Sequence, residues 1–280
     1  MENIAENLKT RVGITGSTGF IGKNLSLYLT GRGFKVIPLE RGFEIKKASG
    51  CDVIINLAGA SIDKRWSKRY KREIINSRTA TTQRVCEAIS KSNSVKLLIN
   101  ASAVGIYKHD NHTLHTEESQ DFSDTFLGDV CRQWEREAMK VRERCKVVIM
   151  RLGVVMSTEG GALKKISLPA KTGIATVVGD GKQYISWIML DDLLNAIHFT
   201  IQHNTIDGIV NMTSPEPITN LDLTRIISKR YKSLFTIKIP EIFFRLLMGE
   251  GSQVVLKGVK VLPSKLMEAG FNFENRAPLL

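Results

Sequence analysis

A glycine-rich turn at residues 16–22 constrains this chain more than any other feature. It reads G-x-x-G-x-x-G, with a short apolar run, Arg11 to Thr15, before it and an apolar stripe of helical spacing after it. In a strand-turn-helix unit of this kind, the first glycine permits the tight turn, the second lets the backbone approach a pyrophosphate, and the third lets the helix pack against the strand. The helix N-terminus also offers free N–H groups to an anion. The turn therefore predicts a dinucleotide site that includes Gly16, Thr18, Gly19, Phe20 and Ile21.

Segments typical of strands and helices alternate through the first half of the chain. The predicted strands are residues 11–15, 35–39, 53–57, 95–100 and 146–150. Helical apolar spacing falls between them, at residues 21–29, 81–89 and 127–141. Because each parallel step requires a right-handed crossover, this alternation predicts an α/β fold with a doubly wound parallel Rossmann sheet.

The pattern changes at about Leu152, where frequent glycines indicate a loop-rich lid facing a substrate. Residues 183–212 then have the character of a return to the sheet, and the prolines beyond them indicate a smaller mixed C-terminal region. We therefore expect a dinucleotide-binding domain over residues 1–155. A smaller substrate or lid domain would follow over residues 156–280, with about 183–212 returning to the Rossmann sheet.

Composition bears on the cellular location of the protein and on whether it contacts a membrane. Four cysteines in 280 residues form no C-x-x-C pair, so we expect reduced thiols and a cytoplasmic location. Residues 1–10 have no apolar core, which argues against a secretory signal. The best apolar run, Ile242 to Met248, is interrupted by Arg245 and is shorter than the roughly 20 residues that a spanning helix needs. The sequence therefore predicts no membrane span and no membrane partner.

The formal net charge of +12 favours an anionic partner but does not choose between a nucleotide and a nucleic acid. The densest basic cluster spans residues 64–72 and includes Trp66 and Tyr70. We interpret it as the solvated face of a helix beside one buried aromatic ring. Because no helix-turn-helix pattern or stacking platform accompanies it, a nucleic-acid partner is disfavoured.

Two residues of opposite charge stand at the end of the second predicted strand. At this position an acid accepts hydrogen bonds from the ribose of NAD, whereas a basic residue pairs with the 2'-phosphate of NADP. Glu40 would repel that phosphate if it pointed inward, and Arg41 could bind it through two hydrogen bonds. NADP(H) and NAD(H) both stay open at this point, as does the possibility that one side chain simply faces solvent.

Further segments carry a resemblance to a known family. In chain order they are residues 16–22, 56–59 (NLAG), 75–78 (INSR), 102–107 (SAVGIY), 131–138 around Trp134, 151–155 (RLGVV), 160–163 (GGAL), 186–193, 211–217 and 270–271. Together they extend over nearly the whole chain. The chain resembles the atypical extended short-chain dehydrogenases/reductases, and in particular the nucleoside-diphosphate-sugar epimerase-like family.

The resemblance implies a Rossmann domain that favours NADP(H) over NAD(H), because the family favours a basic residue where Arg41 stands. Glu40 departs from the small polar residue that is usual there. Besides the turn, the implied cofactor contacts are Glu40, Arg41, Leu57, Ala58, Gly59, Glu73, Arg78 and, at the nicotinamide end, Val155. The implied partner is a small-molecule substrate such as a nucleotide sugar.

The catalytic pair usual in this superfamily is missing. In ordinary members a tyrosine and a lysine four residues later share one helix face, and the lysine lowers the pKa of the tyrosine. If the helix around Trp134 is the equivalent, Cys131 and Glu135 occupy these positions, and neither supplies the same chemistry. Ser102 and Tyr107 are the remaining catalytic candidates, and each can equally be a structural residue at a strand end.

Three histidines, at positions 109, 112 and 115, invite a metal hypothesis. Their polar neighbours indicate an exposed loop, and no cysteine or carboxylate cluster completes a site, so no metal is predicted. Three functions stay open: an NADP-dependent oxidoreductase or epimerase, a catalytically inactive NADP(H) sensor or scaffold, and a nucleic-acid binder. The sequence carries no signal for an oligomeric state.

Overall fold

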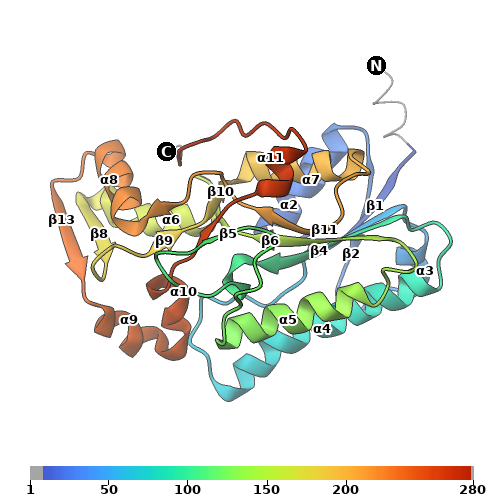
Figure 1. Ribbon diagram of the computed structural model, residues 1–280, viewed down its shortest axis with the longest axis horizontal. Helices are drawn as coiled ribbons and strands as arrows, with labels where there is room; N and C mark the ends of the chain where they lie inside the picture. Colours follow the sequence, from blue (N-terminus) through green and yellow to red (C-terminus); the bar gives the residue numbers. More distant parts are fainter. Residues whose placement is uncertain (1–8, 279–280) are drawn as a thin grey trace.

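A six-stranded parallel sheet runs through the centre of the protein, whose computed structural model describes residues 9–278 (Figure 1). The strands are β1 (Arg11–Thr15), β2 (Lys35–Leu39), β3 (Val53–Asn56), β4 (Leu97–Ala103), β6 (Lys146–Leu152) and β11 (Gly208–Met212). Their spatial order is β11-β6-β4-β3-β1-β2, and every neighbouring pair is parallel. Since β2 and β3 flank β1 on opposite sides, the crevice at the carboxyl ends of β1 and β3 is the topological switch point, where such sheets bind ligands. The predicted doubly wound Rossmann sheet is confirmed.

Helices cover both faces of the sheet (Figure 1). One face carries α2 (Phe20–Gly31), α7 (Leu190–Gln202) and α11 (Ser264–Glu268), and the other carries α3 (Ile45–Ser49), α4 (Lys68–Ser90) and α5 (Phe126–Met139). Strand β3 shows why an unbroken apolar run is needed. Its Ile55 packs in the core with Leu25 of α2, while its Ile54 packs in a separate core with Val85 of α4.

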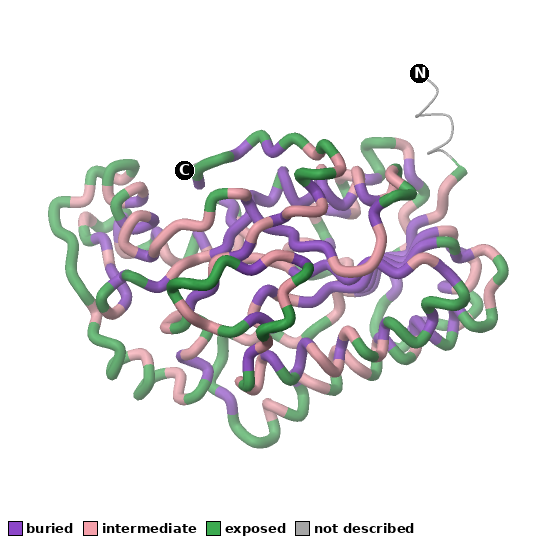
Figure 2. The backbone as a smooth tube through the Cα atoms, viewed as in Figure 1, coloured by how far each residue is buried: buried purple, intermediate pink, exposed green. Residues whose placement is uncertain are grey.

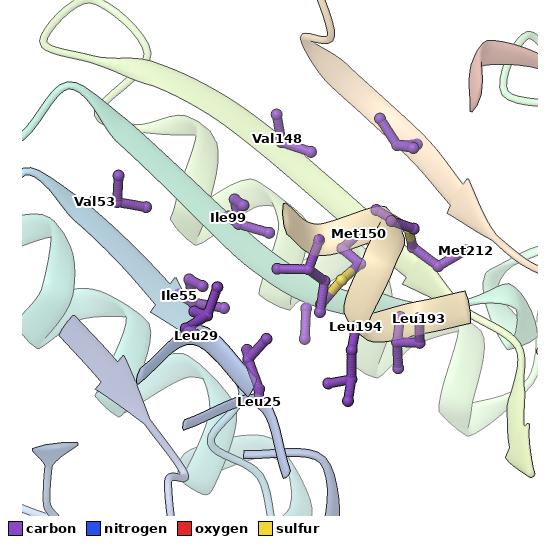
Figure 3. Close-up of a cluster of buried hydrophobic side chains, with 14 of the residues drawn as sticks. Leu25, Leu29, Val53, Ile55, Ile99, Val148, Met150, Leu193, Leu194 and Met212 are labelled. Atoms are coloured by element: carbon purple, nitrogen blue, oxygen red, sulfur yellow. The ribbon is translucent and has the colours of Figure 1, made fainter. Parts of the chain in front are cut away.

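The core on the α2 side is continuous from the first helix to α7 (Figure 3). Leu25 and Leu29 of α2 lie over Ile55, and Leu193 and Leu194 of α7 lie over the other half of the sheet. Each fully buried side chain of this size contributes roughly 1.5–3 kcal/mol. The apolar residues that follow the glycine turn at helical spacing are therefore the α2 residues that pack in this core.

Among the described residues, four two-stranded sheets lie beside the main one, and all but one of their strands come from the chain beyond residue 153. They pair β7 (Val154–Met156) with β10 (Trp187–Met189), β9 (Tyr184–Ile185) with β12 (Ile218–Thr219), β8 (Ile174–Val178) with β13 (Phe235–Ile239), and β5 (Leu114–His115) with β14 (Lys260–Val261). The remaining helical segments are η1 (Val104–Ile106), α6 (Gly161–Ser167), η2 (Ala170–Thr172), α8 (Asn220–Tyr231), α9 (Glu241–Met248), η3 (Gly249–Ser252) and α10 (Gln253–Leu256). The expected lid thus contains short regular elements. Of residues 183–212, β11 joins the main sheet, whereas β10 pairs with β7 outside it.

Helix α4 begins thirteen residues earlier than the apolar spacing indicates, at Lys68 instead of Thr81. Ser67 caps it, because its side chain accepts a hydrogen bond from the Tyr70 N–H at 3.1 Å. The second half of the basic cluster, residues 68–72, is therefore the start of a helix, whereas Lys64 and Arg65 precede the cap, and Trp66 beside them is 7% exposed. The prediction of a solvated helix face next to one buried aromatic ring holds for residues 68–72 and is wrong for Lys64 and Arg65, which are exposed in the preceding loop.

Within residues 9–278, no helix is long and apolar enough to cross a membrane. The expectation that residues 1–10 carry no secretory signal falls almost wholly outside the described part of the chain. Cys51, Cys86, Cys131 and Cys145 are buried free thiols. At the far end of the molecule, β13 and α9 are exposed along most of their length (Figure 2).

Candidate functional site

A cleft of about 390 Å³ opens at the switch point of the sheet. It is bounded by the glycine turn, the ends of β2 and β3 and one side of α4, namely Thr15, Gly16, Ser17, Thr18, Leu39, Glu40, Arg41, Ala58, Gly59, Ala60, Glu73, Ser77 and Thr81. The fold thus brings together seven of the predicted cofactor contacts from four separate segments: Gly16, Thr18, Glu40, Arg41, Ala58, Gly59 and Glu73.

The three glycines of the turn are required for different reasons. Gly16 has a φ of +67°, and a Cβ there would lie 3.0 Å from the backbone of Leu57. A Cβ on Gly22 would lie 2.1 Å from the carbonyl oxygen of Gly16, which no side chain tolerates. The Gly19 N–H donates to that same oxygen at 3.0 Å, and a Cβ on Gly19 would meet it at 3.2 Å and no other described atom within 4 Å. The first and third glycines therefore build the turn, whereas the second leaves its backbone uncovered.

A buried network of polar side chains ties the strands and helices together beneath this cleft. Thr15 Oγ1 donates to Asn56 Oδ1 at 2.6 Å, and Asn56 Nδ2 donates to Thr82 Oγ1 at 2.8 Å and to Asn100 Oδ1 at 2.6 Å. Trp134 Nε1 of α5 donates to Thr82 Oγ1 at 3.0 Å. The carboxyl ends of β1 and β3 and the middle of β4 are therefore held in one arrangement with α4 and α5.

Arg78 of α4 lies behind the cleft and supports its wall. Its Nη1 donates to the carbonyl oxygens of Ala60 and Ile74, both at 3.1 Å. A Cβ on Gly59 would lie 2.9 Å from the Cζ atom of Arg78, so the guanidinium occupies the space that a side chain at position 59 would need. The predicted direct contact of Arg78 with a cofactor stays a prediction, since this side chain does not line the cleft.

A second, larger cleft of about 880 Å³ adjoins the first and shares Arg41, Glu73, Ser77 and Thr81 with it. It is basic on balance, because its lining adds Arg69, Arg72 and Arg84 to Arg41, against the two glutamates Glu73 and Glu87. Arg41 therefore faces both clefts, whereas Glu40 lines the smaller one alone. The boundary between an exposed glycine turn and an arginine-rich cleft suits a phosphate group.

The other predicted contacts line neither cleft. Phe20 lies against the start of α6, where a Cβ on Gly160 would fall 2.5 Å from its ring. The carbonyl oxygen of Val155 lies near the next glycine, Gly161, and would be 3.0 Å from a Cβ placed there. Leu57 and Ile21 pack at the edge of the core. The cofactor roles of these residues, and of Gly19, stay predictions.

Glu135 of α5 stands where the superfamily's lysine is expected, and it is already engaged. Its carboxylate accepts hydrogen bonds from Arg151 Nε at 2.9 Å, from Arg151 Nη2 at 2.8 Å and from Ser102 Oγ at 2.6 Å. The side chains of Arg151 and Glu135 are 2% and 13% exposed. The hydroxyl of Ser102 is therefore directed into a buried ion pair and away from solvent.

Tyr107 is completely buried. Its hydroxyl donates to Asn211 Oδ1 at 2.8 Å, its ring lies 4.8 Å from the Arg151 guanidinium carbon, and it stacks on His115 with ring centroids 5.0 Å apart. Burial raises the pKa of Tyr107, which is the opposite of what a catalytic tyrosine needs. The geometry gives Tyr107 a packing role, and its catalytic role stays a prediction.

The expectation of an exposed loop around the three histidines is wrong for His115. The pairing of β5 with β14 carries His115 into the core, where it is fully buried beneath Tyr107. Among the described residues, no group of three or more His, Cys, Asp or Glu side chains could hold a metal ion. Burial raises the pKa of the Cys131 thiol to about 11, so it is no nucleophile at neutral pH.

Sequence reasoning quoted Arg151 only as part of the segment 151–155 and assigned it no role. The signal that could have found it is a single arginine inside the otherwise apolar run at residues 147–152, because a charge in a buried strand requires a partner. From the sequence, helix register shows only that Glu135 occupies the position at which the superfamily's catalytic lysine is expected. That the two form a pair depends on how β6 crosses α5, which spacing does not reveal.

Comparison with known proteins agrees with this architecture. Residues 12–212 match the model of the NAD dependent epimerase/dehydratase family, and residues 239–276 match a domain of unknown function, DUF1731. The fold and the switch-point cleft define a Rossmann-type dinucleotide-binding protein. The chain belongs to the NAD dependent epimerase/dehydratase family, in the atypical epimerase-like branch of the extended short-chain dehydrogenases/reductases.

Relatives match over almost the full length of the chain. The epimerase family protein SAR0825 of Staphylococcus aureus is 35% identical over 285 residues, which cover 93% of this chain and 94% of that protein. The crystal structure of the human epimerase family protein SDR39U1 with NADPH is 26% identical with a TM-score of 0.89 and covers 96% of each chain. A nucleoside-diphosphate sugar epimerase from Corynebacterium glutamicum is 27% identical with a TM-score of 0.80, over 99% of this chain and 59% of that one.

Proposed function

We propose that this protein binds NADP(H) in preference to NAD(H) and acts as an oxidoreductase or epimerase on a small molecule of the nucleotide-sugar type. The observation that carries the proposal is the place of Arg41, which borders both the glycine-turn cleft and the basic cleft. The NADPH in the crystal structure of the human relative supports the same cofactor. The name of the Corynebacterium relative supports the substrate class.

The residues present fit such a cofactor. The uncovered backbone at Gly19 and the close packing at Gly16 and Gly22 leave room for a pyrophosphate at the start of α2. The adenosine half would be held by Gly16, Thr18, Glu40, Arg41, Ala58, Gly59 and Glu73, with Arg78 behind them. When bound, the nicotinamide supplies hydride-transfer chemistry. Residues 1–155 would provide this site, and residues 156–280 would cover the substrate.

Proton transfer requires a group other than the two on α5. The Cys131 thiol is buried and protonated, and the Glu135 carboxylate is neutralised by Arg151. Ser102 and Tyr107 remain the proposed candidates. Each would have to exchange its present hydrogen bond, to Glu135 or Asn211, for one to substrate.

The same ion pair favours a second function, an NADP(H) sensor or scaffold without catalysis. A buried arginine and glutamate at the usual catalytic position are bound to each other and offer neither an acid nor a base to a substrate. Such a protein would keep the whole cofactor cleft and show no turnover.

Fluorescence titration with NADPH and NADH tests the cofactor assignment. NADPH should bind roughly tenfold or more tightly, since a charge-assisted arginine–phosphate pair is worth about 1.5–3 kcal/mol. Arg41→Ala should remove most of the difference and leave NADH binding unchanged. Tighter binding of NADH would overturn the proposal and make Glu40 the selecting residue.

A further inference from the structure

The turn that carries Arg41 has a defined conformation. The Phe43 N–H donates to the Glu40 carbonyl oxygen at 3.0 Å, and Gly42 has a φ of +77°. Among the described residues, Lys232 is the one non-glycine residue with a positive φ, so the φ of Arg41 is negative. A positive φ at the third position alone is the signature of a type II turn. Arg41 therefore stands at the first corner of this turn, with its side chain exposed.

Helix α4 holds the exit of the turn through one side chain. Arg84 Nε donates to the Phe43 carbonyl oxygen at 2.6 Å, and Arg84 Nη2 donates to the Gly42 carbonyl oxygen at 3.3 Å. Its guanidinium carbon also lies 5.4 Å from the centroid of the Phe43 ring, which is itself buried in the core. Two consecutive carbonyl groups of the turn are thus bound to a helix 41 residues away in sequence.

The helix is a rigid base for this contact. Arg84 is followed by Val85 and Cys86, both buried against the sheet, so the α4 backbone at this point cannot shift independently of the core. The turn, by contrast, has a single backbone hydrogen bond of its own. Without Arg84, the direction of the Arg41 side chain toward the basic cleft would depend on that one bond.

Building on the proposed preference for NADP(H), we propose that Arg84 is a positioning residue for cofactor specificity. It holds the carbonyl groups of Gly42 and Phe43 so that Arg41 faces the 2'-phosphate position between the two clefts. Two of its donors are occupied by these carbonyl oxygens. We therefore assign the effect of Arg84 on the cofactor to the position of Arg41 and not to a phosphate contact of its own, and the Arg41→Ala background below distinguishes the two roles.

A double-variant cycle on Kd for NADPH and NADH tests this proposal. Arg84→Gln should weaken NADPH binding roughly tenfold, because a mobile Arg41 loses most of its phosphate contact, and should leave the Kd for NADH unchanged. In an Arg41→Ala background the same substitution should have no further effect. Arg84→Lys, which keeps the charge but cannot donate to both carbonyl oxygens in the same geometry, should fall between wild type and Arg84→Gln. Arg69→Gln is the matched control, because it removes one charge from the same cleft without touching the turn.

The outcomes separate this inference from the proposal beneath it. If wild-type protein does not prefer NADPH, the proposed function fails and this inference fails with it. The proposed function stands if wild type prefers NADPH and Arg41→Ala abolishes the preference. In that case, the positioning role alone is refuted if Arg84→Gln has no effect, or if its effect adds to that of Arg41→Ala. An equal loss in Arg69→Gln would also refute it, since the cause would then be overall charge. An unchanged Kd for NADH in Arg84→Gln shows that the variant is folded.

Discussion

Arg151 of β6 donates two hydrogen bonds to Glu135 of α5, at 2.9 and 2.8 Å, at the position where a catalytic lysine is expected. Removing one partner of a buried pair leaves an uncompensated charge and costs about 3–5 kcal/mol. Arg151→Met should therefore lower the Tm by roughly 6–20 °C, given about 2–4 °C per kcal/mol for a chain of this size. The double variant with Glu135→Leu should recover most of this loss in calorimetry. A single variant as stable as wild type would disprove the buried pair.

The second and third glycines of the turn should respond differently to substitution. Gly19→Val should abolish NADPH binding in a folded protein, because the side chain stands where the pyrophosphate must approach, while its Cβ would meet just one backbone oxygen of the turn, at 3.2 Å. Gly22→Ala should destabilise the protein itself, because its Cβ would lie 2.1 Å from the Gly16 carbonyl oxygen. Circular dichroism melts and NADPH titration distinguish the two. Normal NADPH affinity in folded Gly19→Val would place the cofactor elsewhere.

Activity assays on three variants test the proposed chemistry. NADPH oxidation is measured with a panel of carbonyl compounds and nucleotide sugars. Cys131→Ala should leave any rate unchanged because the thiol is buried and protonated. Loss of a general acid or base costs about 10² to 10⁴-fold, so a loss of that size in Tyr107→Phe or Ser102→Ala would support the enzyme. A panel without turnover despite tight NADPH binding would favour the sensor. A robust rate destroyed by Cys131→Ala alone would refute the account of the site.

His198 should make stability depend on pH. Burial, with a contribution from the charge of Arg32, lowers the pKa of His198 to about 4, and its ring packs edge-on against Phe34. The unfolded chain binds the proton more readily than the folded protein. The contribution of neutral His198 to the free energy of unfolding is therefore complete above pH 6.5 and is lost as the pH falls toward 4. With a discount for partial solvent exposure, we expect about 1 kcal/mol, or roughly 2–4 °C in Tm. The change in Tm between pH 7 and pH 5 should be smaller in His198→Gln than in wild type, by roughly 2–4 °C. An equal change in both proteins would contradict the assignment.

Two leucines of α9 should tolerate polar substitution. Leu246 and Leu247 are 71% and 62% exposed, whereas Leu25 of α2 is fully buried. Leu246→Asn and Leu247→Asn should change the free energy of unfolding by no more than about 0.5 kcal/mol, and Leu25→Ala should cost about 2–5 kcal/mol. Urea denaturation measures all three. A large loss in either α9 variant would show that this helix is covered in the native protein.

Features that depend on neighbouring residues could be predicted from the sequence. The strand before the glycine turn, the core spacing of α2 and the place of Arg41 at a strand end each depend on a few adjacent positions, because hydrophobic period and turn chemistry are local properties. The first residue of α4 was not located for the same reason, although the basic cluster at residues 64–72 was interpreted as a helix face. Its first turns are so basic that they show no apolar stripe, and the cap at Ser67 is a weak signal.

Tertiary structure alone decided the chemistry around the sites. Ser102, Glu135 and Arg151 come from β4, α5 and β6, and their meeting requires that two strands be neighbours and that one helix cross them. The burial of His115 requires a partner strand at residues 260–261. A buried charge or ring is stable only where the rest of the fold supplies its partner, and that partner can stand anywhere in the chain. The sequence therefore determined by itself where a dinucleotide could bind, and the packing of distant segments decided which polar groups beside it are free to react.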